Sequence, residues 1–389
     1  MQIVFSDQSL PKSITKSIFL AGPSPRNNKV LDWRHEALKH LNALGYDGTV
    51  FIPIPSSLFY NGENDLSWNY DNQIQWECLC RQVADVILFW IPRDLNNLPG
   101  FTTNIEFGED LASTKVRYGR PDSAEKCRYI DLRYEELRNN KVVNDLSKLI
   151  SNIVSELGEG SLRENGEVYV PLFIWQSNQF KSWYNNLKEA GNRLDFLKLL
   201  HVYKIKNKDV FSYVIWVNIW IEKEKRFKNN EFVFTRTDIS AVVGHYKENN
   251  EEFVILVKEF RSPVNNSEGF IYELPGGSSP VEEDQLITAK TEFFEETGLL
   301  ISDEHRFKLI NKRQLAATLS SHCCFLYKVK LNKTEFNILK DIELEQIKNT
   351  DIKIEDNNEK TYVKIINIKD LNTILIDYST LGMIKEAIL

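Results

Sequence analysis

The sequence predicts two domains of different class, an α/β domain in residues 1–150 and an α+β domain in residues 171–389. Three observations support this division. Apolar runs alternate with helical patterns as far as residue 135. From residue 237 onward, strand-like and turn-like segments follow one another and lead into a single acidic helix. Finally, 389 residues exceed what one hydrophobic core holds and suit two or three domains.

The composition excludes several classes of protein. The hydrophobic share of 42% suffices for globular cores, and the net charge of -7 argues against binding to a nucleic acid backbone. The longest apolar run, residues 86–92, is far shorter than a membrane span, and the first residues do not resemble a signal peptide. Five scattered cysteines fit a reducing compartment. We therefore expect a cytoplasmic protein that binds neither nucleic acid nor membrane.

In the first domain, strand and helix patterns alternate along the chain. Strands are expected at residues 17–23, 48–55 and 86–92, and a last strand at residues 118–121 and 128–132. Helices are expected at residues 33–46, 71–85 and 102–113. This alternation predicts a parallel sheet of the Rossmann or flavodoxin type, with a ligand site at the carboxyl ends of its strands.

Five segments of this domain resemble the nucleoside 2-deoxyribosyltransferase-like family: IFLAGP near the start, residues 45–55, Trp76-Glu77, residues 84–93 and residues 100–108. The resemblance covers about residues 14–135. It implies that Glu106 attacks the anomeric carbon of a nucleoside and that Asp85 recognises the base. The product would be a glycosyl-enzyme ester that water or another base resolves.

The same resemblance places Phe19 and Gly22 in the substrate site. Phe19 stands where transferases often carry a tyrosine that orients the nucleophile, and a second family aspartate has no counterpart in residues 98–104. Transfer between bases and hydrolysis of a modified or phosphorylated nucleoside are therefore both open. The alternative for Glu106 is an acid that interacts only with the dipole of its helix.

Residues 151–170 are predicted to form a linker, because GEGSLRENGE is rich in glycine and polar residues. Residues 171–235 then form an N-terminal extension of the second domain, with a helical pattern followed by an alternating strand at residues 210–227. Its tryptophans are expected to pack in a core or an interface, and a base-stacking platform is the alternative.

An acidic helix organises the second domain. Glu292, Glu295 and Glu296 are spaced i, i+3 and i+4, so a helix brings them to one face. Like charges so placed repel each other, and a hard divalent cation that takes oxygen ligands removes the repulsion. Gly277 precedes this helix and Gly298 follows it at the position of a C-cap. The pattern predicts a Mg²⁺ or Mn²⁺ site.

The segment from Gly277 to Leu299 resembles the signature of Nudix hydrolases, and all its glycines and glutamates are in register. The resemblance implies an α+β Nudix fold, with Glu292, Glu295 and Glu296 as metal ligands and Glu296 also catalytic. Glu283 is half a helical turn out of phase, so it would act catalytically from the loop edge or through water. Thr291 replaces the arginine of the signature.

Further residues resemble the ADP-ribose pyrophosphatase branch of that family. Arg261 and Glu273 match residues that contact substrate there, and Gly277 adjoins the same site. In this branch a loop glutamate positions the attacking water, and both Glu355 and Glu359 are candidates. The remaining strands are expected at residues 308–331 and 362–371, followed by a terminal helix.

The sequence thus predicts a bifunctional enzyme that acts on a small nucleoside or nucleotide. One domain breaks or exchanges an N-glycosidic bond, and the other hydrolyses a nucleoside diphosphate linked to a second group with the help of magnesium. The competing hypothesis is a sensor that binds nucleotides with both domains and does not turn them over. Both families assemble as dimers or larger, so we expect a homodimer or a higher homo-oligomer.

Overall fold

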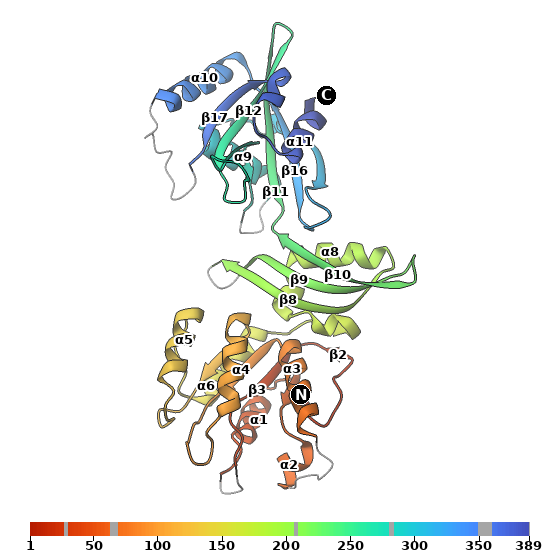
Figure 1. The fold of residues 1–389 in the computed structure, drawn as a ribbon, viewed down its shortest axis with the longest axis vertical. Helices are drawn as coiled ribbons and strands as arrows, with labels where there is room; N and C mark the ends of the chain where they lie inside the picture. The colour runs from red at the N-terminus through yellow and green to blue at the C-terminus, as the bar shows by residue number, and fades with distance from the viewer. Residues whose placement is uncertain (27–29, 63–68, 206–208, 280–283, 349–359, 389) are drawn as a thin grey trace. The chain divides into compact units, whose positions relative to one another are not determined.

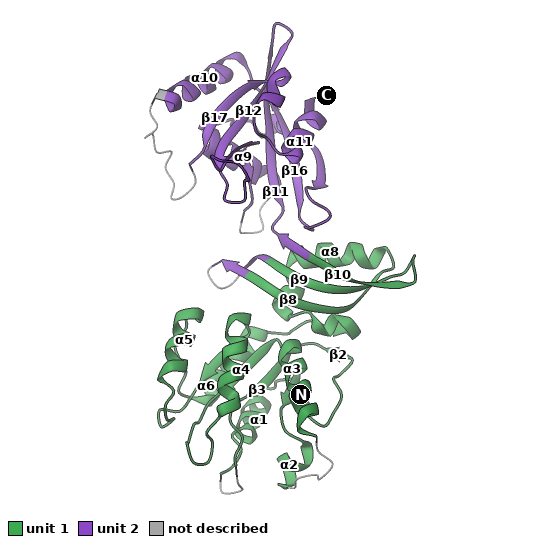
Figure 2. Ribbon diagram, in the orientation of Figure 1, with its two compact units in different colours: residues 1–202, 213–232 green, residues 203–212, 233–389 purple. Residues whose placement is uncertain are grey.

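The computed structural model describes residues 1–26, 30–62, 69–205, 209–279, 284–348 and 360–388 (Figure 1). The chain forms two compact units (Figure 2). Unit 1 comprises residues 1–202 and 213–232, and unit 2 comprises residues 203–212 and 233–389. The three boundaries therefore fall within the strands of one small sheet rather than in a free linker.

Unit 1 contains a five-stranded parallel sheet in the order β1-β4-β3-β5-β6. Its strands are β1 (Gln2–Phe5), β3 (Ser17–Ala21), β4 (Thr49–Ile52), β5 (Val86–Trp90) and β6 (Val116–Gly119). All residues of β3, β4 and β5 are buried, as expected for parallel strands that are covered on both faces. The predicted α/β class is confirmed. Because the chain turns from β4 back past β3 to β5, the strand order reverses beside β3.

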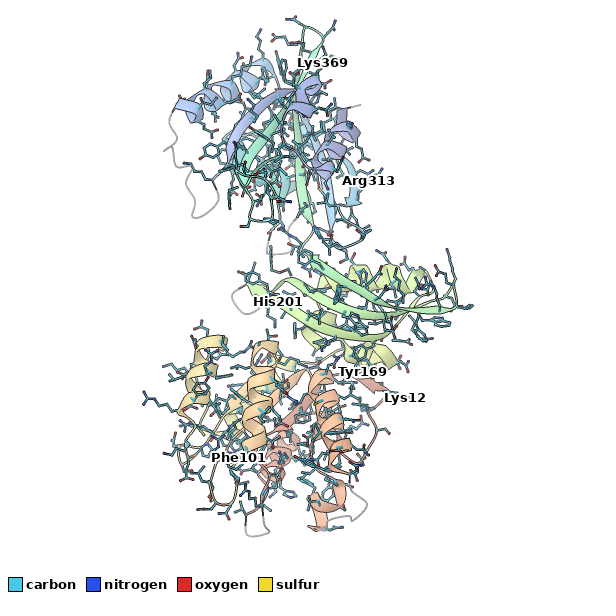
Figure 3. All side chains as sticks on the ribbon, viewed as in Figure 1. Lys12, Phe101, Tyr169, His201, Arg313 and Lys369 are labelled. Atoms are coloured by element: carbon cyan, nitrogen blue, oxygen red, sulfur yellow. The ribbon has the colours of Figure 1, made fainter. Side chains whose placement is uncertain are left out.

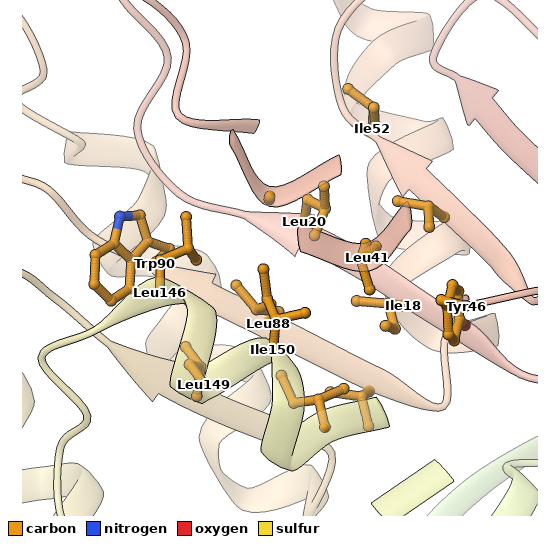
Figure 4. Packing of buried hydrophobic residues seen from close by; sticks show 14 of the residues in the cluster. Ile18, Leu20, Leu41, Tyr46, Ile52, Leu88, Trp90, Leu146, Leu149 and Ile150 are labelled. Atoms are coloured by element: carbon orange, nitrogen blue, oxygen red, sulfur yellow. The ribbon is translucent and has the colours of Figure 1, made fainter. Parts of the chain in front are cut away.

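Helices cover both faces of this sheet. On one face, α1 (Arg34–Ala43) and α6 (Leu146–Leu157) pack on Ile18, Leu20 and Leu88 (Figure 4). On the other face, α3 (Tyr70–Val83), α4 (Phe101–Asp110) and α5 (Arg128–Arg138) pack on Phe19 and Phe89. The period-two alternation along β3 therefore divides its side chains between two hydrophobic cores.

Two predictions for this domain are wrong. Residues 128–132 form the start of α5 and not a strand, because Ile130 and Tyr134 have the i, i+4 spacing that buries one face of a helix. Residues 151–170 are not a free linker. They contain the end of α6, β7 (Arg163–Glu164) and a 3₁₀ helix at Asn165–Tyr169, and β7 pairs with β2 (Ser13–Ile14).

A buried ion pair explains why the predicted linker is held in place. The guanidinium of Arg163 donates to both oxygens of Asp85 at 2.7 Å, and both side chains are almost fully buried. Ser17 Oγ also donates to Asp85, at 2.9 Å, and the backbone N–H of Leu172 donates to it at 2.8 Å. Through these contacts Asp85 connects residues 163–172 to the amino end of the parallel sheet.

A short helix, α2 (Ser56–Asn61), follows β4. After the 3₁₀ helix at Asn165–Tyr169, the chain forms α7 (Leu172–Trp175), α8 (Asn178–Glu189) and a three-stranded sheet of order β10-β9-β8. Its strands are β8 (Arg193–Ile205), β9 (Asp209–Ile221) and β10 (Arg226–Arg236). The predicted strand at residues 210–227 is confirmed for most of its length. Trp175 contacts Phe180 and Tyr184, so the predicted packing role of this tryptophan is also confirmed.

Unit 2 is built on a mixed sheet of order β13-β12-β11-β16-β15, in which β17 also pairs with β12 and β14 with β11. The strands are β11 (Ile239–Glu248), β12 (Glu251–Phe260), β13 (Phe270–Glu273), β14 (Gly276–Gly277), β15 (Lys308–Gln314), β16 (Cys323–Lys330) and β17 (Tyr362–Asn367). Only β11 and β16 pair in parallel among the described strands of this sheet.

Among the described residues of unit 2, three α-helices pack on this sheet: α9 (Gln285–Thr297), α10 (Lys333–Lys348) and α11 (Tyr378–Ile388). Phe293 of α9 and Phe336 of α10 belong to one core, and Ile384 of α11 belongs to the other, so the helices lie on both faces of the sheet. The predicted acidic helix and terminal helix are confirmed. The sequence predicts a loop at residues 332–360, but residues 333–348 form α10. No helix within the described ranges is long and apolar enough to cross a membrane.

Candidate active site

A cleft of about 340 Å³ opens at the carboxyl ends of the parallel strands of unit 1. Gly22 follows β3, and Pro53 and Ile54 follow β4, so the turns after neighbouring strands form its floor. Helix α3 contributes Glu77, and α4 contributes Glu106. The cleft therefore lies where the strand order predicts a ligand site. We call it the Glu106 cleft.

Gly22 allows two turns to approach each other closely. A Cβ atom at this position would lie 2.2 Å from the carbonyl oxygen of Trp90 and 2.9 Å from the Trp33 ring. Its φ of +151° is also rare for residues with a side chain. Gly22 lines the cleft, as the sequence predicts, and the space that it leaves open accommodates the turn after β5.

Arg34 fixes the turn after β3 and places a positive charge beside the cleft. Its side chain is fully buried, and its Nη2 donates to the carbonyl of Gly22 at 2.7 Å. Nε donates to the carbonyl of Leu20 at 3.0 Å, and Nη1 pairs with Asp32 at 3.0 Å. A buried guanidinium with this many partners is rigid, so the turn of residues 22–24 is held in one conformation.

Two carboxylic acids, Glu77 and Glu106, meet in the cleft. Gln73 orients Glu77 by donating to its Oε1 at 2.6 Å, and the same amide donates to the carbonyl of Pro53 at 2.6 Å. Burial raises the pKa of Glu77 to about 7, and repulsion from Glu106 and a hydrogen bond to Glu106 add to this rise. The two acids therefore form a hydrogen-bonded pair.

The titrations of Glu77 and Glu106 are linked. Burial also raises the pKa of Glu106, but the bond from Glu77 and the charges of Arg81 and Arg34 oppose the rise. Because the two buried acids interact, the raised pKa values belong to the pair, and ionising both acids at once is unfavourable. Within the pair, the charge of Arg81 favours the ionised form of Glu106.

Arg81 stabilises the negative charge on Glu106 and contacts the last turn of α4. Its guanidinium pairs with Asp110 at 2.6 Å and Glu109 at 2.9 Å, and Nη1 reaches the backbone carbonyl of Glu106 at 3.5 Å. Among the charges that oppose the raised pKa of Glu106, that of Arg81 has the largest effect. The side chain is 7% exposed, so water screens this interaction poorly.

Two residues that the sequence assigned to this site lie outside it. Asp85 precedes β5 and therefore lies at the amino end of the sheet, where Arg163 occupies both of its oxygens. Phe19 is buried in the middle of β3 and packs on Trp76, with ring centroids 6.3 Å apart. Neither side chain lines the Glu106 cleft, so the structure does not bring Asp85 or Phe19 together with Glu106.

Among the cleft residues described above, Gln73, Glu77 and Arg34 were not assigned to the site from the sequence. A signal existed for two of them. Gln73 and Glu77 are four residues apart on α3, so a helix places them on one face, and Glu77 belongs to the Trp76-Glu77 pair that carries the family resemblance. No local pattern distinguishes Arg34 from the other charged residues of α1.

In unit 2, several acidic residues gather around the glycine turn. The backbone N–H of Gly276 donates to Glu296 Oε2 at 2.9 Å. Burial raises the pKa of Glu296 well above its usual value, Gly276 opposes this, and the charges of Glu292 and Glu259 raise it further. A Cβ at position 277 would lie 2.4 Å from a Glu292 oxygen, so Gly277 leaves room for that carboxylate.

Arg261 and Glu273 lie together, as the sequence predicts for substrate-contacting residues. Arg261 Nε donates to Glu273 at 2.9 Å, and its guanidinium pairs with Glu259 at 2.8 Å. Arg261 also acts electrostatically on Glu296. The ion pairs therefore connect Glu273 and Glu259 to the carboxylates of α9.

The predicted face of three metal ligands is only partly formed. Glu296 is buried and Glu292 is half-buried, but Glu295 is exposed because it lies about 100° around the helix from Glu296. In the part of the chain that the structure describes, no three His, Cys, Asp or Glu residues are arranged to hold a metal ion. The predicted positions of Glu283, Glu355 and Glu359 lie outside the described residues.

The donors that are present still fit a hard cation. Glu292 and Glu296 repel each other, Glu296 is held away from water, and Gly277 provides the space beside Glu292. Carboxylate oxygens are the ligands that Mg²⁺ and Mn²⁺ prefer. The resemblance of residues 277–299 to the Nudix signature stays a prediction.

A comparison with known families bears on unit 1. Residues 15–122 match the family described as nucleoside 2-deoxyribosyltransferase like. No curated protein matches the chain. The matched segment contains β3 to β6 and the residues that line the Glu106 cleft. Residues 15–122 therefore form a nucleoside 2-deoxyribosyltransferase-like domain.

Proposed function

We propose that unit 1 cleaves or exchanges the N-glycosidic bond of a nucleoside or nucleotide, with Glu106 as the nucleophile. The observation that carries this proposal is that two buried carboxylic acids, both with raised pKa values, meet in a cleft of the matched domain. An ionised carboxylate beside a neutral carboxylic acid provides a nucleophile and a proton donor in one site.

In the first step, a Glu106 oxygen forms a bond to the anomeric carbon, and the C–N bond breaks with its electrons going to the base. Glu77 donates its proton to the departing base, which leaves in neutral form. Formation of the glycosyl ester removes the negative charge of Glu106. This loss ends the repulsion that helps to raise the pKa of Glu77, so Glu77 becomes a stronger acid as the reaction proceeds.

In the second step, water or a second base attacks the anomeric carbon and the ester bond to Glu106 breaks. Glu77, now a carboxylate, accepts the proton of the attacking water or base and returns to its neutral form. Glu106 leaves as a carboxylate that Arg34 and Arg81 stabilise. The cycle restores the starting protonation of both acids, so hydrolysis and transfer differ only in the acceptor.

This mechanism predicts a pH profile that depends on Glu77. The first step needs Glu77 in its protonated form, and its pKa is about 7. We expect kcat/KM for base release to fall about tenfold per pH unit above pH 7 in the native protein. In Glu77→Gln this fall should be absent and the plateau rate should be lower. An unchanged profile in Glu77→Gln, measured by base release between pH 5 and 9, would remove Glu77 from the mechanism.

A second activity is favoured by the carboxylates of unit 2. We propose that unit 2 hydrolyses a nucleoside diphosphate linked to a second group, with Arg261 and Glu273 contacting the substrate. Glu292 and Glu296 would hold Mg²⁺ or Mn²⁺, with Glu295 and Glu283 at the edge of the site. When bound, the cation supplies Lewis-acid activation of a phosphate oxygen. Arg261 carries a positive charge next to that position and can neutralise a second phosphate.

The role of Glu296 can be measured without turnover. We expect 5 mM Mg²⁺ to raise the melting temperature of native unit 2 and to have a much smaller effect on Glu296→Gln, because bound ligand stabilises the folded state. Hydrolysis of ADP-ribose should fall at least tenfold in the same variant. The control is Glu345→Gln, an exposed position on α10. Equal Mg²⁺ stabilisation of all three proteins would contradict a metal site at Glu296.

A further inference from the structure

A second cavity, of about 440 Å³, lies in unit 1 about one helical turn beyond Glu106 along α4. Its walls come from α3, from the end of α4 and the following 3₁₀ helix at Leu111–Ser113, and from residues 198–202 of β8. Tyr169 and His201 lie on this cavity and are labelled in Figure 3. Residues 169–202 lie outside the family match, so the match does not account for this cavity.

Two buried cations line the cavity and retain unused hydrogen-bond donors. Arg81 Nε is buried and has no hydrogen-bond acceptor among the described residues. Lys115 is 7% exposed, and its Nζ donates to the carbonyls of Arg81 at 2.6 Å and Gln82 at 2.8 Å, which leaves a third N–H. Burial lowers the pKa of Lys115 to about 8, so most of the amine is charged at pH 7. An acceptor on a bound molecule would satisfy these donors.

The charge at the cavity is positive. Arg81 pairs with both Glu109 and Asp110. Together with Lys115 and Lys198 it places three positive charges on the wall against two carboxylates. Lys198 is exposed on β8, where it can meet a negatively charged group at the rim.

The rest of the wall suits a flat heteroaromatic body. Tyr169, Leu199 and Val202 give it an apolar surface, and the volume lies in the range of small-molecule sites. Strand β8 is an edge strand, since the sheet order is β10-β9-β8. Backbone N–H and C=O groups along such an edge match the donors and acceptors of a heterocyclic base. Gln82, whose amide reaches the Leu197 carbonyl at 3.4 Å, adds a further polar group.

We infer that the cavity between α3, the end of α4 and β8 is a second ligand site, which takes a planar heteroaromatic molecule carrying one anionic group, the class of nucleoside monophosphates. Arg81 connects this site to Glu106. An anion beside Arg81 weakens its stabilisation of the Glu106 carboxylate, so the bound ligand inhibits base release. The inhibition of base release rests on the proposed function of unit 1, whereas the binding of the ligand does not.

Binding is tested on the Glu106→Gln protein, which cannot turn the probe over. Calorimetric titration with AMP should show a site that Ala112→Trp weakens at least tenfold, because Ala112 lines the cavity and is exposed. The matched control is Ala43→Trp, on an exposed position of α1 away from the cavity. Lys198→Ala should weaken AMP several-fold, and Lys181→Ala, on the exposed face of α8, should not.

Two further probes separate the parts of the ligand. Adenosine should bind less tightly than AMP, and inorganic phosphate should bind weakly at this site. The inference is overturned if AMP does not bind, or if Ala112→Trp and Lys198→Ala both leave its affinity unchanged. Phosphate that binds as tightly as AMP would overturn the heteroaromatic part. In the active protein, AMP that binds the second site without slowing base release would overturn only the link through Arg81.

Discussion

Glutamine in place of Glu106 is expected to reduce release of the base by about 10³-fold or more, because the amide cannot form the glycosyl ester. The substitution keeps the shape of the side chain and removes its negative charge. It also removes the repulsion that raises the pKa of Glu77. The variant therefore buries less negative charge, and its melting temperature should not fall. The measurement is release of free base from deoxynucleosides and nucleoside monophosphates, followed by chromatography.

Glu135→Gln provides the matched control for Glu106→Gln. Glu135 is an exposed acid on α5 and does not line the cleft. Its replacement should leave the rate of base release within about twofold of the native value. If Glu106→Gln retained the native rate while remaining folded, the alternative that Glu106 interacts only with the dipole of α4 would be favoured.

Arg163→Met is expected to destabilise unit 1 by about 3–5 kcal/mol, since it leaves the buried charge of Asp85 without its partner. From the residues that the structure describes, the hydrogen bonds of Ser17 and Leu172 would remain to that carboxylate. The segment after α6 would be held less firmly to the parallel sheet, through the bond from Leu172 and the pairing of β7 with β2. Urea denaturation followed by circular dichroism measures this loss, and the midpoint of the unit 1 transition should fall accordingly.

Two comparisons distinguish the buried ion pair from a general loss of arginine. Arg193→Met removes an exposed pair with Asp195 and should cost less than about 1 kcal/mol. The double variant Asp85→Asn with Arg163→Met should be more stable than Arg163→Met alone, because no unpaired charge stays buried. Equal stability of the single and double variants would contradict an uncompensated charge as the cause.

Local patterns predicted much of the fold correctly. The apolar run at residues 86–92 contains a fully buried strand, because only a strand covered on both faces needs apolar side chains at every position. Gly298 follows the acidic helix with a φ of +73°, as a left-handed C-cap requires. The spacing of apolar residues and the glycine positions are local properties, so a single sequence reveals them.

Long-range pairing explains most of the errors. Asp85 was assigned to the substrate site, but Arg163, its partner in a buried ion pair, lies 78 residues further along the chain. No local feature of either segment indicates that Asp85 pairs with Arg163. The same argument applies to Glu77, whose importance follows from its contact with Glu106 on a different helix. Arg34 was overlooked because its role depends on the turn after β3, which it meets only in the folded chain.

The geometry of a helix limits what spacing predicts for α9. Residues at i, i+3 and i+4 lie broadly on one side, but the last two differ by about 100° in direction. Glu296 therefore turns inward to Gly276, and Glu295 stays exposed. The spacing identified the acidic helix correctly but overestimated how closely its three carboxylates converge.

The most direct test of the account is a search for the glycosyl ester on Glu106. Native protein and Glu106→Gln would be mixed with a deoxynucleoside or deoxynucleoside monophosphate, quenched with acid within milliseconds to seconds, and digested for peptide mass spectrometry. We predict a deoxyribosyl or deoxyribosyl phosphate adduct on the peptide that contains Glu106, which forms as the free base is released and is absent from the variant. Base release that proceeds at the native rate in Glu106→Gln, with no adduct in either protein, would contradict the central claim.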